Sequence, residues 1–447
     1  MTTPIQINAN ESKTVAAHIA AGLDDLVGAP TLRSDSLARF SASGLPNRRV
    51  EAWKYTQLNT LAKTPFHPVI HAPKAKTIPA FDKSFLPDDI AALLVFVDGH
   101  LREDLCDLSN MAVSGLALTT LGAALNTDSQ KLESHISAGA GIADSLMDLN
   151  AAFMTDGAVI TLGDGIIVEK PIVIVSHAST PGAAVHMRNV ITLGHGAQAS
   201  IIEINGPAIG ESFTNTVSDI TLGKNASLIH GRIQNEAALA IHLNRAKVAL
   251  EERAEYSSFA FASGAALSRQ ETDVAFNGSG GTARLYGITL GRDGQHIDHT
   301  TRVHHGQPDC ATEELFKSVL DDHAHGVFQG RIHVAPYAIG TDARQKTQTL
   351  LLSGRAVADA KPELEILADD VQCAHGATVG DLDRDALFYM AARGIPPKQA
   401  RDLLIAGFIE DAIDRFGAIN ANAATLSTLL RRHFQHWRDT LGDKDNG

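Results

Sequence analysis

The sequence predicts a mainly β fold, a parallel β-helix (β-solenoid) flanked by N-terminal and C-terminal α-helical regions. The stretch at about 155–380 is dense in Val, Ile, Thr and Gly, and it has no helical pattern long enough to connect parallel strands in a βαβ unit. A short pattern also returns in that stretch at near-constant spacing, while helical periodicity precedes and follows it. We therefore expect an N-terminal helical and mixed region at 1–150, the β-solenoid at 151–380 and a C-terminal helical region at 381–447.

The repeat is clearest in three successive segments. The sequence at 159–163 returns at 190–194 and, with one change, at 219–223, so that Thr161, Thr192 and Thr221 lie 31 and then 29 residues apart. Weaker echoes follow at 247–250, 273–276 and 301–304. Stacked coils explain such a period, because each coil buries its aliphatic interior only against its neighbours. A β-sandwich of antiparallel hairpins stays an alternative, although its strands seldom repeat at a near-fixed period.

Before the solenoid, helical and loop-like patterns alternate. The periodicity at about 11–61 is helical, and Thr31 or Ser34 is a suitable N-cap for its second helix. Five prolines at 64–90 predict a loop-rich connection. The Ala- and Leu-rich stretch at 112–153 predicts further helix.

After the solenoid, three amphipathic helices are expected. Asp383 can cap the first, which Gly394 ends, and Pro397 suits the first turn of the second. The third has a broad apolar face that includes Trp437. Two interpretations stay open, since these helices could close the open end of the solenoid or form a docking surface for a partner.

Composition excludes several classes of protein. The chain has 38 Lys+Arg against 51 Asp+Glu, a net charge of −13, which argues against a nucleic-acid binder. Its longest apolar runs, at 91–97 and 403–409, are far shorter than the ~20 residues that a membrane span requires. Three cysteines and an N-terminus without a secretory pattern predict a reduced protein of the cytoplasm.

Motifs for nucleotide or hydrolytic chemistry are weak or missing. The chain contains neither a Walker-type Gly-x4-Gly-Lys-Ser/Thr sequence nor a Gly-x-Ser-x-Gly elbow. The glycine-rich segment at 278–283 fits a loose dinucleotide fingerprint, but it precedes a strand-like alternation and reads as a turn. A solenoid carbohydrate-active enzyme would need paired acids on one face, whereas the neighbours Asp321 and Asp322 point opposite ways on a strand.

Histidines gather late in the predicted solenoid, with Cys310 among them. Imidazole and thiol together suit iron or zinc. However, strand alternation sends near neighbours to opposite faces, and the further cysteines of a zinc knuckle are missing. We expect surface or coil-stacking histidines, and assign no role to the group His296, His299, His304, His305, His323, His325 and His333.

Cys373 and His375 stand where the solenoid meets the C-terminal helices. They are two residues apart, so that in a strand they project from the same face. A thiolate and an imidazole presented together can bind iron or accept sulfur, although a lone cysteine is more often a small buried hydrophobe. These two residues are the candidate metal ligands.

The segment around that pair resembles SufD, a subunit family of the SUF iron–sulfur cluster assembly machinery. The similar residues are 364–380, Leu387-Phe388-Tyr389 and Arg393-Gly394-Ile395, with further matches at 295–298, 327–332 and 350–352. Residues 49–56 match the R-x-E-x-W-K-Y-T pattern of the same family. SufB-like chains instead carry His-Glu-Ala where this chain has His375-Gly376-Ala377. The resemblance spans about 47–416.

The resemblance implies a right-handed parallel β-helix and a non-catalytic scaffold subunit. The expected partners are a SufB-like paralogue, bound through the β-helix, and a SufC-like ABC ATPase, bound through the C-terminal helices. No cofactor is expected to stay bound, but a transient iron–sulfur cluster would be shared with SufB. His375 is the expected nascent-cluster ligand, with Cys373 beside it. The residues expected at the partner surface are Leu387, Phe388, Tyr389, Arg393, Gly394, Ile395 and Phe408.

Two alternatives stay open beside this interpretation. The chain could form a homodimer through the same β-helix surface, which would hide His375. It could also be a solenoid carbohydrate-active enzyme, a class that usually carries a secretion signal.

Overall fold

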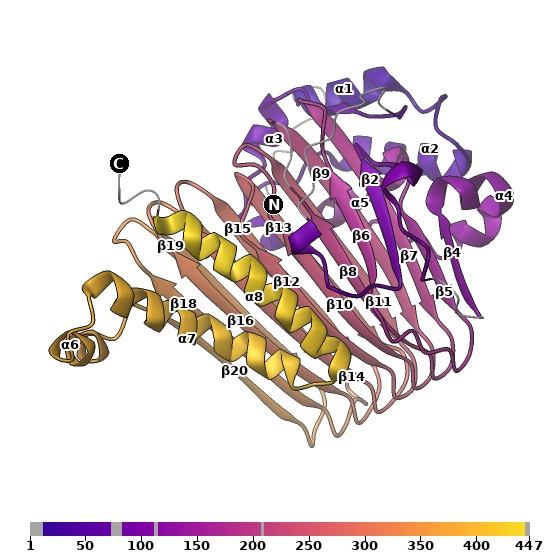
Figure 1. Cartoon of the computed structure of the whole chain (residues 1–447). Helices are drawn as coiled ribbons and strands as arrows, with labels where there is room; N and C mark the ends of the chain where they lie inside the picture. The colour runs from indigo at the N-terminus through magenta and orange to yellow at the C-terminus, as the bar shows by residue number, and fades with distance from the viewer. Residues whose placement is uncertain (1–11, 73–82, 111–114, 207–209, 443–447) are drawn as a thin grey trace.

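A computed structural model describes residues 12–72, 83–110, 115–206 and 210–442 of the chain. Its centre is a β-solenoid in which two parallel strands form each coil (Figure 1). The coil strands are β5 (Ala158–Leu162), β6 (Ile172–His177), β7 (Ala183–Leu193), β8 (Gln198–Asn205), β9 (Ser212–Leu222), β10 (Ser227–Gln234), β11 (Ile241–Leu250), β12 (Glu255–Ala262), β13 (Leu267–Phe276), β14 (Thr282–Gly291), β15 (His296–His305), β16 (Ala311–Leu320), β17 (His325–Val334), β18 (Asp342–Leu351), β19 (Val357–Ile366) and β20 (Gln372–Gly380).

Odd-numbered and even-numbered strands form two separate sheets, here called the odd sheet and the even sheet. The odd sheet runs from β19 to β5, and the even sheet from β20 to β6, each in steps of one coil. Thr161 pairs with Thr192, which pairs with Thr221, so the sequence repeat is the coil register itself. The predicted solenoid is confirmed, and the antiparallel sandwich is wrong because the coil strands pair in parallel.

The turns after the first odd strands explain the Gly or Asn that follows each repeat. Gly165, Gly196, Asn225 and Arg253 have left-handed φ values of 68°, 67°, 56° and 53°. Glycine and asparagine adopt this conformation at low cost. The turns also bond to one another, because Gly196 N donates to Lys224 O at 2.8 Å. The repeat is therefore a property of both strand and turn.

The N-terminal region covers one end and one face of the solenoid. It contains α1 (Lys13–Ala21), α2 (Pro30–Ser43), α3 (Asn59–Lys63), α4 (Leu121–Glu133), α5 (Ser145–Phe153), β1 (His67–Pro68), β2 (Ala92–Val97), β3 (His100–Leu101) and β4 (Leu116–Thr120), with 3-10 turns at Glu51–Trp53, Lys83–Phe85, Glu103–Leu105 and Ile142–Asp144. Strand β4 pairs with β5 and β2 with β6, so both sheets are extended at this end. Apolar residues of α1, α2 and α5 pack on the odd sheet around Phe213 and Ile241.

Several N-terminal predictions need correction or fall outside the described residues. The second helix begins at Pro30 with Ala29 as its N-cap, so neither Thr31 nor Ser34 caps it. A proline suits the first helical turn because its missing N–H would be unpaired there in any case. The stretch at 112–153 does contain α4 and α5, as predicted. Parts of the patterns at 11–61, 64–90 and 112–153 lie in the undescribed ranges 1–11, 73–82 and 111–114.

The solenoid interior is more polar than the sequence suggested. Aliphatic residues such as Ile201, Ile220 and Val248 do form its core. Hydrogen bonds also cross from one sheet to the other, from Ser218 Oγ to Glu203 Oε1 at 2.6 Å and from Thr301 Oγ1 to Glu314 Oε2 at 3.0 Å. The prediction of a purely aliphatic interior was therefore wrong.

The C-terminal helices are α6 (Arg384–Ala392), α7 (Pro397–Gly417) and α8 (Ala421–Gly442). Asp383 accepts hydrogen bonds from the first turn of α6 and Pro397 begins α7, as predicted. Helices α7 and α8 lie along the outer face of the even sheet, while α6 projects beyond it (Figure 1). They cover a face and leave the end of the solenoid uncovered, so the interpretation as an end cap was wrong. None of the helices in the described ranges has the length and apolarity needed to cross a membrane.

Candidate functional site

Strand β20 carries Cys373 and His375 on the last coil of the solenoid. It pairs with β18 on one side and ends the even sheet, so its other edge has no strand partner among the described residues. Cys373 lies opposite Ala343, and His375 opposite Gln345. The predicted strand is confirmed, and with it the expectation that both side chains project from one face.

The two side chains differ in environment. Cys373 is half-buried and packs against the interior core, whereas His375 is exposed. Burial raises the pKa of the Cys373 thiol, and the carboxylate of Asp342 raises it further. In the isolated chain Cys373 is therefore a neutral thiol, and the thiolate considered from the sequence would need a metal ion or a nearby cation to form.

A polar column leads from the interior to His375. Glu314, Gln345 and His375 occupy the same register on β16, β18 and β20. Glu314 Oε2 accepts hydrogen bonds from Gln345 Nε2 at 2.7 Å and from Thr301 Oγ1 at 3.0 Å. Glu314 Oε1 and Gln345 Oε1 have no hydrogen-bond partner within the described chain, and burial raises the pKa of Glu314 to about 7. A carboxyl group able to exchange a proton near neutral pH thus lies two strands from His375.

The outer side of β20 borders a hollow of about 690 Å³. Its lining includes the segment 374–376 and the cations Arg344, Lys346 and Arg415. Arg344 pairs with Asp342 at 3.0 Å, but no acidic partner of Lys346 is found in the described part of the chain. An unpaired ammonium attracts acidic groups, so this side of the strand favours an acidic partner surface.

Apolar side chains surround the open solenoid end. Ile339, Val357, Ile366, Leu367 and Val379 are exposed on the last coils and their turns. A sheet edge with unpaired N–H and C=O groups and exposed aliphatic residues is a template for strand addition by another chain. The end that carries His375 is therefore suited to protein association.

Helix α6 presents the aromatic residues of the expected partner surface. Phe388 is 77% exposed and Tyr389 59%. The Arg393 guanidinium carbon lies 4.8 Å from the Tyr389 ring centre, and Nη2 of Arg393 donates to the Tyr389 hydroxyl at 2.6 Å. Gly394 follows with a φ of 79°, which ends the helix.

Leu387, Ile395 and Phe408 are less accessible than Phe388 and Tyr389. Leu387 and Phe408 pack against the core beneath α7, and Ile395 is half-buried. Lys317 of the even sheet holds α7 in place, since its Nζ donates to Phe408 O at 2.7 Å and to Asp411 Oδ2 at 2.6 Å. The structure thus separates two exposed aromatic residues from others that join α6 and α7 to the sheet.

The histidine group divides into two kinds. His296 and His304 stack on His325 and His333 of the next coil, with ring centres 4.6 and 4.8 Å apart, as expected. His299 and His305 are buried, so the surface interpretation was wrong for them. Each stacked pair is 29 residues apart, the spacing of one coil, and this was the signal that strand alternation alone did not reveal.

Comparison with known proteins gives a consistent result along most of the chain. Residues 174–408 match the family described as "SUF system FeS cluster assembly, SufBD core domain", and residues 9–174 match the "SufBD protein N-terminal region". The chain is 31% identical to the iron–sulfur cluster assembly protein SufD of Escherichia coli, over 83% of this chain and 85% of that protein. It is 28% identical to an iron–sulfur cluster assembly SufBD family protein of Synechocystis, over 83% and 84% of the two chains.

Proposed function

The chain belongs to the SufBD family of the SUF iron–sulfur cluster assembly system, and we propose that it acts there as a SufD-like, non-catalytic scaffold subunit. In this role it pairs with a SufB-like paralogue through the open end of its solenoid and binds a SufC-like ATPase through α6 and α7. His375 is the ligand it contributes to a nascent cluster formed between the two solenoids. The cluster is cargo of the assembly and leaves with the acceptor protein.

The position of His375 is the observation that supports this proposal most directly. Its imidazole is exposed on the unpaired edge strand β20, on the same face as Cys373 and among exposed aliphatic residues. Imidazole and thiolate sulfur are both ligands of iron in proteins. A partner strand added to this edge would cover the site and exclude bulk water from it.

The neighbouring groups suit the handling of a proton at such a site. Cys373 is held as a thiol by burial, so its coordination to iron would release a proton. Glu314 has a pKa of about 7 because of burial and lies in the register column that leads to His375. It is the titratable group of this column best matched to accept a proton near neutral pH.

The proposed ATPase surface rests on α6. Phe388 and Tyr389 expose aromatic rings on a helix that projects from the solenoid, an arrangement typical of a residue that inserts into a partner pocket (Figure 1). A hollow of about 500 Å³ lies between α6 and α7 beside Phe388, with room for a partner side chain. The chain supplies no nucleotide-binding loop of its own, so ATP hydrolysis comes from the partner.

Anaerobic purification of the tagged full-length chain from its native cells tests the proposal. We expect recovery of a paralogue and an ABC-type ATPase, and assembly of a cluster when iron and a sulfur donor are supplied. His375→Ala should keep both partners but lower the iron and sulfide bound per complex at least tenfold. His195→Ala, at an exposed histidine of a solenoid turn, is the matched control.

Two results would contradict parts of the proposal. Full cluster formation by the His375→Ala complex would show that His375 is not a ligand. Recovery of the chain only as a homodimer, under conditions that preserve other complexes, would favour isologous pairing of two β20 edges, which are available to a second copy as well as to a paralogue.

A further inference from the structure

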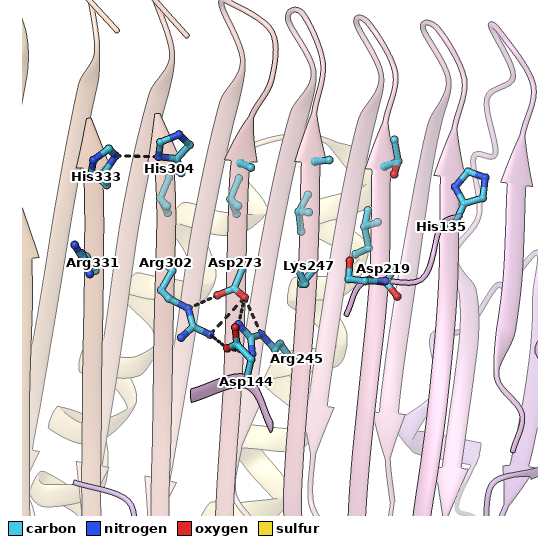
Figure 2. Close-up of a pocket in the computed structure, with 18 residues that line it drawn as sticks. His135, Asp144, Asp219, Arg245, Lys247, Asp273, Arg302, His304, Arg331 and His333 are labelled. Atoms are coloured by element: carbon cyan, nitrogen blue, oxygen red, sulfur yellow. Dashed lines mark hydrogen bonds and ion pairs between the residues drawn. The ribbon is translucent and has the colours of Figure 1, made fainter. Parts of the chain in front are cut away.

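A second histidine arrangement lies on the outer face of the odd sheet, away from β20. His304 on β15 and His333 on β17 are register partners, and their Nδ1 atoms are 2.9 Å apart (Figure 2). Their rings are nearly parallel, with ring centres 4.8 Å apart and an interplanar angle of 24°. Both line a hollow of about 580 Å³ on this face. The pair is therefore preformed and open to solvent.

Two neutral imidazoles at this separation share one proton between their Nδ1 atoms. Burial and the neighbouring His333 lower the pKa of His304, so the neutral form is favoured at neutral pH. Imidazole nitrogens bind first-row metal ions at about 2.0–2.1 Å, and two of them at a right angle around one ion are then about 2.9 Å apart. A metal ion could thus replace the shared proton, which would move to Nε2 of the same ring.

A carboxylate completes the row on the next strand. Glu365 of β19 is the register partner of His333, so histidine, histidine and glutamate lie side by side on three consecutive coils. Hydrogen bonding and charge from Arg331 lower the pKa of Glu365, as does the proximity of His333, and the carboxylate is ionised at neutral pH.

Glu365 has to change partners before it can bind a metal. Its Oε2 is bonded to Arg331, and no three His, Cys, Asp or Glu side chains of the described residues already surround a common metal position. The Arg331 and Glu365 side chains are 56% and 44% exposed, and an exposed ion pair contributes at most about 1 kcal/mol. Coordination to a divalent ion can therefore displace it.

We propose that His304, His333 and Glu365 form a binding site for a divalent first-row transition-metal ion. Two imidazoles and one carboxylate with open positions for water are the ligand set typical of non-haem iron(II). This site is separate from His375 and stands without the proposed scaffold function.

The charges around the row permit a cation. Arg302, the nearest cation below His304 in Figure 2, is bonded to Asp273 at 2.6 Å and to Glu271 at 2.8 Å. Lys247 lies between Asp219 and Asp273 in the register of the odd sheet, so its charge is flanked by two carboxylates. The remaining cation, Arg331, is the one that leaves Glu365 when the ion binds.

Anaerobic calorimetric titration of the full-length chain with iron(II), and with cobalt(II) as a spectroscopic probe, tests this site near neutral pH. We expect one equivalent of metal bound with visible cobalt bands from nitrogen ligands. His304→Ala and His333→Ala should each weaken that binding at least tenfold, and Glu365→Gln about tenfold. His195→Ala and His375→Ala should bind this equivalent as the wild type does.

The variants also separate this proposal from the scaffold function. Unchanged metal binding by His304→Ala, or loss of the equivalent only in His375→Ala, would overturn the site. Failure of cluster assembly in His375→Ala with intact cobalt bands would leave it standing. Circular dichroism of each variant checks folding, which these replacements on a solvent-facing row should leave intact.

Discussion

The guanidinium carbon of Arg269 lies 4.2 Å from the centre of the Trp53 ring. Arg269 is completely buried on β13, where it is ion-paired to Asp298 and Glu271. Its Nη2 also donates to Ala52 O at 2.9 Å. Trp53 thus covers a buried ionic network and fixes the N-terminal region to the odd sheet, which gives the R-x-E-x-W-K-Y-T segment a structural role.

Replacement of Trp53 by alanine should destabilise the chain by about 3–5 kcal/mol, because it opens a cavity over a buried cation. Trp53→Phe should cost less, since it keeps an aromatic ring and loses only the hydrogen bond from Nε1 to Ala143 O at 2.9 Å. Thermal unfolding followed by circular dichroism measures the difference. Equal midpoints for Trp53→Ala and the wild type would show that this contact does not stabilise the fold.

Much of the solenoid could be predicted because its repeat is visible in the chain. The threonines at 161, 192 and 221 share a register, and Asp383 and Pro397 mark helix starts by local chemistry alone. Neither pattern shows which surface a helix covers. The position of α7 and α8 depends on apolar residues of the even sheet such as Phe259 and Ile288, which look like any other strand residues in sequence.

The candidate site was predictable only where its residues are close in sequence. Cys373 and His375 are two apart, so strand alternation sufficed. The column from Glu314 to His375 and the pair His304–His333 join different coils. To find them from sequence, the 29-residue coil spacing would have to be applied to polar residues as well as to the apolar repeat.

Acid should destabilise the N-terminal region through a buried histidine pair. His18 Nδ1 donates to Thr14 O at 2.8 Å, so its Nε2 must accept from His186 Nε2, also at 2.8 Å. Burial lowers the pKa of His18 to about 4 and that of His186 well below its usual value. The unfolded chain therefore binds more protons below pH 6.5, and stability falls as the pH drops from about 6.5 to 4.

The slope assigned to each such histidine is about 1.4 kcal/mol per pH unit in that range. His18→Gln should flatten the pH dependence of the unfolding midpoint between pH 6.5 and 4. The other buried histidines, such as His299 and His305, contribute to the wild-type slope and stay in the variant. An unchanged slope in His18→Gln would contradict the assignment to this pair.

Glu314 should give the opposite pH dependence. Burial raises its pKa to about 7 in the folded chain, so between about pH 4.5 and 7 the folded state binds more protons than the unfolded state. The stability contributed by this group is complete below pH 4.5 and is lost as the pH rises through about 7. Glu314→Gln should then be more stable than the wild type above pH 7, by about 3 kcal/mol at most. Parallel stability curves of variant and wild type would show that Glu314 does not titrate in this range.

Phe388→Asp should weaken binding of the SUF ATPase at least tenfold, a loss of about 1.4 kcal/mol, because it places a charge where an exposed aromatic ring is expected to insert. Phe388 is 77% exposed, so the unfolding midpoint should hardly change. Leu387→Asp is the contrasting variant, since Leu387 packs against the core beneath α7 and its replacement should lower the midpoint. Affinity capture of the purified ATPase on immobilised chain measures the first effect. Equal capture by wild type and Phe388→Asp would exclude this aromatic residue from the interface and move the docking surface off α6.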